Sequence, residues 1–261
     1  MNVLDAVADP RSRPDPEDPA AVLAMPVVLR IERADPPART ALLAAAASAA
    51  LAVCLDPRSG VDAEGLPGPW HEPVLAWCCG RIRKVSRRAR GAHWAAVGEL
   101  AGVTVDVGGA QARALVPVPV GETSPLVRRL QISGTELEPD EPGAVPDGMP
   151  VLWLDAGLEM TVGKAAAQVG HATMLLAASL RADDLEAWRA CGWACAVRDA
   201  APGDFARELG RPGSVAVRDA GYTEVPAGSV TAVTRWGEPA QRDGRARAAL
   251  RAAAGAVGVR T

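Results

Sequence analysis

Lysine is scarce in this sequence of 261 residues. Only Lys84 and Lys164 are lysines, although the chain holds 28 Lys and Arg residues together. An ammonium is a compact point charge on a flexible stem, whereas a guanidinium is a planar fork, so the two are not interchangeable at a binding site. Lys164, which lies close to Gln168 and His171, is therefore expected to be needed as an ammonium.

The sequence also lacks a disulfide framework and a zinc motif. Its five cysteines are an odd number without regular spacing, which is typical of a protein kept in a reducing cytoplasm. Cys78 and Cys79 are adjacent, and no second pair of Cys or His has the spacing of a zinc finger. We therefore expect a cytoplasmic protein with no metal and no cofactor.

Excess positive charge and membrane segments are missing too. The net charge is −3, so a nucleic-acid contact has to use a local basic patch, such as the run from Arg81 to Arg90. The N-terminus has no basic region followed by an apolar run. The Ala-rich stretch 41–55 is shorter than a membrane span. We therefore expect no membrane partner.

What is present divides the chain into four parts. Residues 1–24 are charged and dense in proline, which predicts a disordered tail. The acidic, Pro- and Gly-rich residues 134–148 predict a linker. Residues 25–133 and 149–261 remain as two folded units.

The residue patterns predict α/β structure in both units. The first unit has expected strands at 25–33, 74–83, 103–107 and 114–120, and expected helices from Pro37 to about residue 55 and at 91–100. The second unit begins with a strand, a turn and an Ala-rich helix. It has further expected strands at 214–217 and 230–234, and a helix is expected within 238–261.

The second unit repeats landmarks of the first in the same order. Met25 and Met149 each open a strand, a turn and an Ala-rich helix, and Gly91 and Gly203 open similar segments further along. We interpret this as a diverged duplication, the alternative being chance similarity of two Ala- and Val-rich segments. The predicted fold is two tandem three-layer units, each a small mixed β-sheet flanked by helices. Packed as a pseudo-dimer, they would make the protein a monomer.

The polar residues do not repeat. Aligning the two methionines places Thr40, Ala44 and Ala47 opposite Lys164, Gln168 and His171, so the first unit is expected to be a fold without a site. A helix over 164–175 would place Lys164, Gln168 and His171 on one face. A second polar motif, around Asp219, lies between two expected strands. Taken alone, it is better explained as a hairpin connection.

Together the two motifs resemble the type 2 peptidyl-tRNA hydrolase family over residues 149–237. The first motif consists of Asp155, Met160, Gly163-Lys164, Ala166-Ala167-Gln168 and His171-Ala172. The second consists of Asp219-Ala220-Gly221, Thr223 and residues 226–231, with Ala227 inserted between Pro226 and Gly228. The resemblance implies that the substrate is peptidyl-tRNA and that the reaction is hydrolysis of the ester between the peptide and the 3′ ribose.

Such a hydrolysis needs a water nucleophile, stabilisation of an oxyanion and a proton for the leaving oxygen. The resemblance implies three catalytic residues. Lys164 would stabilise the oxyanion or hold the terminal phosphate, Asp219 would orient or deprotonate water, and Thr223 would hydrogen-bond the water or the substrate carbonyl. The implied substrate-binding residues are Gln168, His171 and Gly221. A lone helical histidine such as His171 is more often a packed, hydrogen-bonded residue.

Three positions depart from the family pattern. Glu159 and Val162 stand where the family has lysines, and Glu224 stands where it commonly has Gln. The alternative function is therefore a catalytically altered or inactive member of the fold that binds RNA or protein.

The first unit supplies two further candidate substrate-binding residues, Arg87 and Arg88. Both belong to the basic run from Arg81 to Arg90, which either contacts phosphate groups of RNA or protects an exposed sheet edge with charge. The seven tryptophans are irregularly spaced, and we interpret most of them as core or interface residues.

Overall fold

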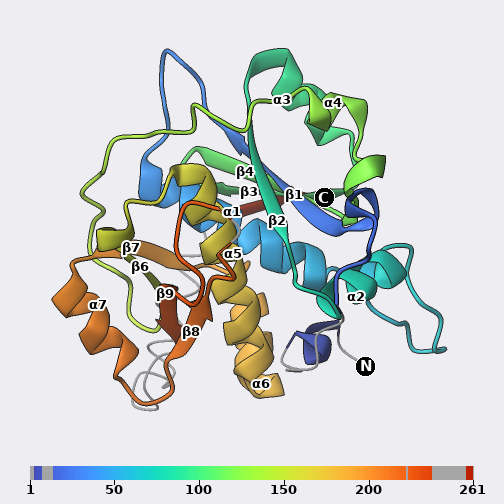
Figure 1. The fold of residues 1–261 in the computed structure, drawn as a ribbon. Coiled ribbons are helices and arrows are strands. Elements are labelled where there is room, and N and C mark those ends of the chain that lie inside the picture. The colour runs from blue at the N-terminus through green and yellow to red at the C-terminus, as the bar shows by residue number, and fades with distance from the viewer. Residues whose placement is uncertain (1–2, 8–13, 222, 237–256, 261) are drawn as a thin grey trace.

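The computed structural model describes residues 3–7, 14–221, 223–236 and 257–260 (Figure 1). Two mixed β-sheets flanked by helices make up the protein, so the α/β fold class is confirmed. Within these residues, no helix combines the length and the apolar character needed to cross a membrane.

The first sheet is built mainly from the N-terminal half of the chain. Its order is β10-β3-β4-β1-β2, with β1 and β2 parallel and the other neighbours antiparallel. A short strand, β5, pairs with β1 outside this order. The strands are β1 (Leu23–Arg30), β2 (Lys84–Ala89), β3 (Gly102–Val107), β4 (Ala110–Leu115), β5 (Val118–Pro119) and β10 (Val257–Arg260).

The second sheet belongs to the C-terminal half. Its order is β7-β6-β9-β8, with β6 and β7 parallel and the other pairs antiparallel. The strands are β6 (Val151–Asp155), β7 (Ala196–Ala200), β8 (Val215–Arg218) and β9 (Val230–Arg235). The order β2-β1-β4-β3 of the first sheet has the same connections and strand directions as β7-β6-β9-β8 of the second.

Two long helices lie between the sheets at the centre of the molecule (Figure 1). They are α1 (Arg39–Leu55), which follows β1, and α5 (Val162–Ser179), which follows β6. Almost every residue of α1 from Thr40 to Cys54 is buried, because one side packs on the first sheet and another on α5. A helix enclosed on all sides needs to be apolar all round, and its many alanines permit close packing. One continuous core therefore joins the two halves.

Shorter helices cover the outer faces of the sheets. α3 (Gly91–Gly98) and α4 (Pro125–Arg128) share a small core with Val28 and Leu115 of the first sheet. α7 (Pro202–Leu209) places Phe205 against Val233 on the face of the second sheet that points away from α5. The other helices are α2 (His71–Cys78), α6 (Ala182–Arg189) and the 3-10 turns Val3–Ala6, Pro19–Ala21, Pro57–Ser59, Val120–Glu122 and Ala156–Leu158.

Two of the expected strands were wrong. Residues 74–83 were predicted as a strand, but α2 ends at Cys78 and β2 begins only at Lys84. Val74, Trp77 and Cys78 are the buried residues of α2, and their spacing of three and four is helical. The strand predicted at 114–120 is in fact two: β4 begins at Ala110, directly after the Gly108-Gly109 turn, and ends at Leu115, and the short β5 covers Val118–Pro119.

Both chain ends differ from the expected organisation. Val3 and Leu4 are buried in the core, where a disordered tail was expected. Residues 257–260, assigned to the second unit, instead pair with β3 of the first sheet. The helix expected within 238–261 falls mainly on 237–256, which lie outside the described residues.

The tryptophans are packing residues, as predicted. Trp70, Trp77, Trp188 and Trp193 are buried, and the other three pack against the edges of the hydrophobic cores.

Candidate active site

The N-terminus of α5 is fixed by three separate segments of the chain. The hydroxyl of Thr161, the N-cap residue, accepts from Lys164 N at 3.1 Å. The carboxylate of Glu224 in turn accepts from Thr161 N at 3.1 Å and from its hydroxyl at 2.9 Å. Gly163 N donates to the hydroxyl of Thr135 at 3.2 Å. These bonds satisfy backbone donors that a helix start leaves unpaired, and they hold Lys164 in place.

The loop after β8 is closed by backbone hydrogen bonds. Asp219 N donates to Ser229 O at 2.9 Å, and Gly228 N donates to Asp219 O at 2.7 Å. Gly221 has a φ of +79°, and a Cβ at this position would lie 2.6 Å from Cβ of Ala227. Only glycine fits there without strain. The loop therefore presents the Asp219 side chain toward α5.

A buried ion pair connects this loop to α5. Lys164 Nζ lies 2.6 Å from Asp219 Oδ2, and the two side chains are only 8% and 9% exposed. Gln168 Nε2 donates to the same oxygen at 2.8 Å, and Gly221 N donates to Asp219 Oδ1 at 2.8 Å. The hydroxyl of Thr231 donates to Gln168 Oε1 at 2.6 Å, which fixes the orientation of the amide. The carboxylate is thus held by three donors.

Thr223 completes the cluster. Its hydroxyl lies 3.4 Å from Lys164 Nζ, and the residue itself is exposed. Lys164, Asp219 and Thr223, the three residues expected to be catalytic, therefore lie together with Gln168.

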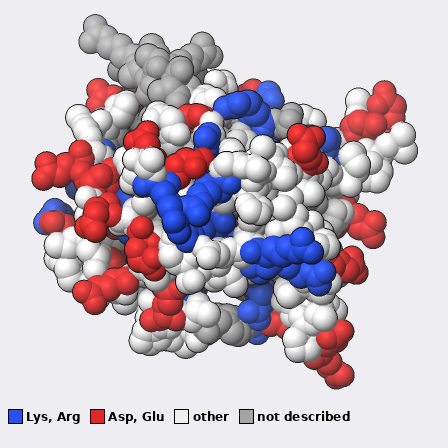
Figure 2. All heavy atoms as spheres, turned by 90° about the horizontal axis from the view of Figure 1, so that it is seen from above, with Lys and Arg blue, Asp and Glu red and all other residues white. Residues whose placement is uncertain are grey.

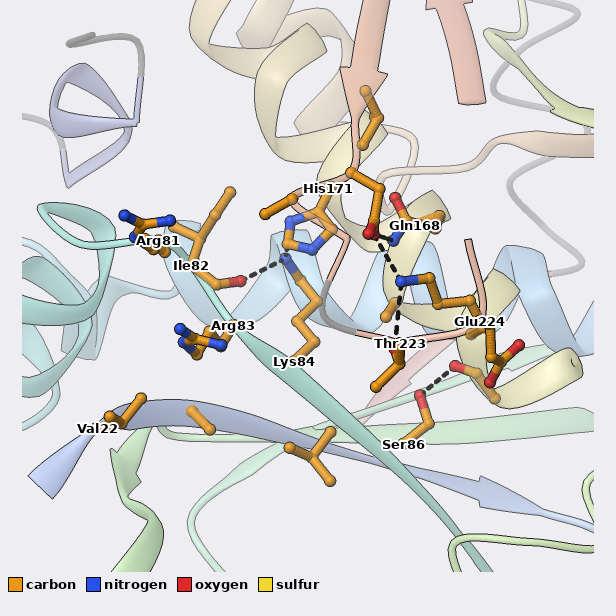
Figure 3. A pocket seen from close by; sticks show the side chains of 18 of the residues that line it. Val22, Arg81, Ile82, Arg83, Lys84, Ser86, Gln168, His171, Thr223 and Glu224 are labelled. Atoms are coloured by element: carbon orange, nitrogen blue, oxygen red, sulfur yellow. Dashed lines mark hydrogen bonds and ion pairs between the residues drawn. The ribbon is translucent and has the colours of Figure 1, made fainter. Parts of the chain in front are cut away.

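The cluster faces a cavity of about 830 Å³ that both halves of the protein line. One wall is β2 and the residues before it, and the opposite wall is α5 with the Asp219 loop, as Figure 3 shows. The lining includes Arg81, Arg83, Lys84 and Ser86 from the N-terminal half, and Lys164, Gln168, His171, Asp219, Thr223 and Glu224 from the C-terminal half.

His171 reaches this cavity next to the second lysine of the chain. Lys84 Nζ lies 3.0 Å from His171 Nδ1 (Figure 3). Burial, followed by the charges of Lys84 and Lys164, lowers the pKa of His171 well below its usual range. Burial also lowers the pKa of Lys84 to about 7. The sequence placed Lys84 in the basic run from Arg81 to Arg90 but did not single it out as a site residue, although the rarity of lysine applied to it as much as to Lys164.

Arg87 and Arg88 point elsewhere and are not part of the cavity lining. Arg87 Nη1 donates to Leu130 O at 2.8 Å, and Arg88 Nε donates to Gln131 Oε1 at 2.8 Å. Both bond to the segment after α4, and β2 forms an edge of the first sheet. Figure 2 shows basic side chains on the upper face gathered in separate patches bordered by acidic ones.

The three departures from the family pattern have different surroundings. Val162 is buried in the shared core, where a charged residue would be costly. Glu224 accepts from Thr161 and so joins the Asp219 loop to α5. Glu159 ends the 3-10 turn before α5 in a left-handed conformation, with a φ of +45°.

The C-terminal half thus forms an α/β domain with a lysine–aspartate pair in a cavity. Its residues 150–242 match the model of the family Peptidyl-tRNA hydrolase PTH2, which confirms the resemblance found over residues 149–237. The matched segment includes α5 and the Asp219 loop but not β2. Neither the search of curated proteins nor that of solved structures gave a match.

Proposed function

We propose that the protein hydrolyses the ester bond of peptidyl-tRNA and releases free tRNA and peptide. The observation that carries this proposal is the meeting of Lys164, Asp219 and Thr223 in one cavity, inside the segment that matches the family. The three residues come from two parts of the chain about 55 positions apart, and hydrogen bonds orient them toward one another.

Lys164 would stabilise the oxyanion. When the water oxygen attacks the ester carbonyl carbon, negative charge develops on the carbonyl oxygen, and a fixed ammonium lowers the energy of that state. Asp219 holds the ammonium at 2.6 Å, and Gln168 holds Asp219. The Lys164 ammonium is therefore in position before the substrate binds, so it does not have to move during the reaction.

Asp219 and Thr223 would handle the water. The carboxylate accepts a hydrogen bond from the attacking water or takes its proton, and the Thr223 hydroxyl fixes the water or the substrate carbonyl. The bond from the carbonyl carbon to the 3′ oxygen then breaks, and the proton from the water passes to the ribose oxygen. Gln168 and His171 line the cavity beside this reaction centre.

The two halves would be descendants of one duplicated unit that now pack as a pseudo-dimer. The matching strand orders of the two sheets and the packing of α1 on α5 between them support this. In a single unit the equivalent helix face would need a partner molecule, so we propose a monomer in the cytoplasm. A light-scattering mass near twice that of the chain would contradict the monomer.

The test is release of free tRNA from an N-acetylated aminoacyl-tRNA. We expect turnover by the wild-type protein and a large loss in Lys164→Ala and Asp219→Asn, each checked for folding by circular dichroism. An inactive wild-type protein would contradict the proposal. So would activity that survives both substitutions.

The alternative is an altered or inactive member of the fold that binds RNA or protein. The observation in its favour is that Glu159 and Val162 replace two family lysines, which leaves less positive charge for RNA. A gel shift at two salt concentrations, run beside the hydrolysis assay, separates the two functions. Binding that weakens with salt, without turnover, supports the alternative.

A further inference from the structure

We propose that the N-terminal half contributes Lys84 to the site as a second cation, which binds a phosphodiester group at the acceptor end of the tRNA. The inference rests on the proposed function and names a residue outside the segment that matches the family. It would explain why this half, without a site of its own, remains packed against the catalytic half.

The position of Lys84 is fixed by β2. Side chains two residues apart on a strand share a face, so Lys84 and Ser86 both point toward α5. The hydroxyl of Ser86 donates to Gly163 O at 2.6 Å, next to Lys164. This bond ties β2 to the first turn of α5, while Lys84 extends into the cavity beside His171.

Gly170 provides the space for the lysine stem. A Cβ at Gly170 would lie 3.0 Å from Lys84 Cε, 3.1 Å from Lys84 Cδ and 3.2 Å from the Cβ of Ala50. Glycine inside a helix is less favourable than alanine, so its presence here needs a reason. The middle of α5 is therefore shaped to let the Lys84 side chain pass.

The two lysines differ in how their charges are compensated. Lys164 is paired with Asp219, whereas no carboxylate in the described ranges pairs with Lys84. Lys84 Nζ contacts His171 Nδ1 at 3.0 Å and Ile82 O at 3.5 Å, and it lies 4.9 Å from the centroid of the Trp77 ring. A half-buried lysine without a counter-charge favours an anionic ligand, because the anion stabilises its protonated form.

Phosphate is the anion that the proposed substrate supplies at this place. The C-terminal carboxyl of the peptide is consumed in the ester, so it carries no charge. The phosphodiester groups next to the terminal ribose are present in every tRNA, and phosphate contacts position a nucleic acid without reading its sequence. Arg81 and Arg83, which precede Lys84 and line the same cavity, are bonded to Asp15.

The experiment compares two forms of one small probe by calorimetry. The first is the dinucleotide CpA, which has a single anionic phosphodiester. The second is the same dinucleotide with an uncharged methylphosphonate link. We expect the wild-type protein to bind the charged form about tenfold more tightly, and Lys84→Met to lose this preference. Arg207→Met is the matched control, because it removes one positive charge from α7, on the other side of the second sheet.

Lys84→Gln repeats the measurement with a polar side chain in case Lys84→Met does not fold. If folded Lys84 variants keep the tenfold preference, the inference is wrong, and hydrolysis by the wild-type protein would leave the proposed function standing. A preference that depends on Lys84 in a protein without hydrolytic activity would support the phosphate site and contradict the proposed function. No preference in the wild-type protein would overturn the inference directly.

Discussion

The two central helices are equivalent in the fold but different in chemistry. α1 and α5 each follow the central parallel strand of a sheet, and the two sheets share one strand order. At the aligned positions, α1 has Thr40, Ala44 and Ala47, all buried. α5 has three polar residues that face the cavity. An apolar pattern is therefore enough to keep the fold, while a few polar side chains make the site.

The N-terminal half lacks these polar residues, but it still contributes to the cavity. Its edge strand β2 forms one wall of the cavity and brings Lys84 next to His171. Substitutions in each half can therefore separate the residues that carry out the chemistry from those that shape the cavity.

The largest effect is expected from Asp219→Ala. The substitution leaves the Lys164 ammonium buried without its carboxylate, and breaking a buried pair in this way costs roughly 3–5 kcal/mol of unfolding free energy. Asp219→Asn, which keeps the shape and one acceptor, should cost clearly less. Urea denaturation measures both. Equal stability of the Ala variant and the wild-type protein would show that the pair does not hold the loop to α5.

Lys164→Met is expected to lower the rate strongly and to cost less stability than Asp219→Ala, because Gln168 and Gly221 still donate to the Asp219 carboxylate. Removing one fixed donor to a developing oxyanion typically lowers kcat by about 10²–10³-fold, and methionine fills the space of the lysine stem. Hydrolysis of an N-acetylated aminoacyl-tRNA gives the rate. The matched control is Thr40→Met at the aligned position of α1, for which we expect an unchanged rate. A similar loss in both variants would mean that packing, and not charge, controls the activity.

Features of the fold and the site could be predicted from the sequence where they depend on residues close together in the chain. The helix face with Lys164, Gln168 and His171 and the turn at Gly221 are readable from spacing and residue type. The apolar run around Trp77 was mistaken for a strand, because a short apolar run does not distinguish a strand from a buried helix.

Contacts between distant parts of the chain leave no local pattern in the sequence. The pairing of β10 with β3 and the approach of Lys84 to His171 join residues far apart in the chain. The roles predicted for Arg87 and Arg88 remain untested, but these residues bond to the segment after α4 and not to the cavity.

Lys84→Met should change how stability depends on pH. Burial lowers the pKa of Lys84 from 10.5 to about 7 in the folded protein. Between these values the unfolded chain binds more protons, so the stability of the wild-type protein rises with pH by up to about 1.4 kcal/mol per unit. The variant lacks this dependence. It should be more stable than the wild type at pH 7, by roughly 1–3 kcal/mol since Lys84 is only half-buried, and the advantage should shrink toward pH 10.

The titratable groups next to Lys84 are Cys54 of α1, Cys78 of α2 and His171 of α5. All three are present in both proteins, and burial, the main cause of the low pKa of His171, keeps its ring neutral above pH 7 in either one, so the difference between the two pH profiles reports on Lys84. Denaturant titrations at pH 7, 8, 9 and 10 provide the profiles. Parallel profiles would show that Lys84 has an ordinary pKa, and would weaken the view of it as an uncompensated cation.

The smallest effects are expected from substitutions at the N-termini of the two central helices. The hydroxyl of Thr40 donates to Asp140 Oδ2 at 2.6 Å, and the hydroxyl of Thr161 caps α5 and donates to Glu224. Replacing either threonine with alanine should cost about 1 kcal/mol of unfolding free energy.

Only Thr161→Ala should also slow hydrolysis, because it loosens the contact between the Asp219 loop and the helix turn that carries Lys164. Thermal unfolding and the hydrolysis assay on both variants test this pair. Equal stability losses with unequal rates would show that a threonine hydroxyl stabilises the start of each helix, but that only the one in the C-terminal half also supports the chemistry. Equal rates would mean that the remaining bonds, from Lys164 and Gln168 to Asp219 and from Thr161 N to Glu224, hold the loop without the hydroxyl.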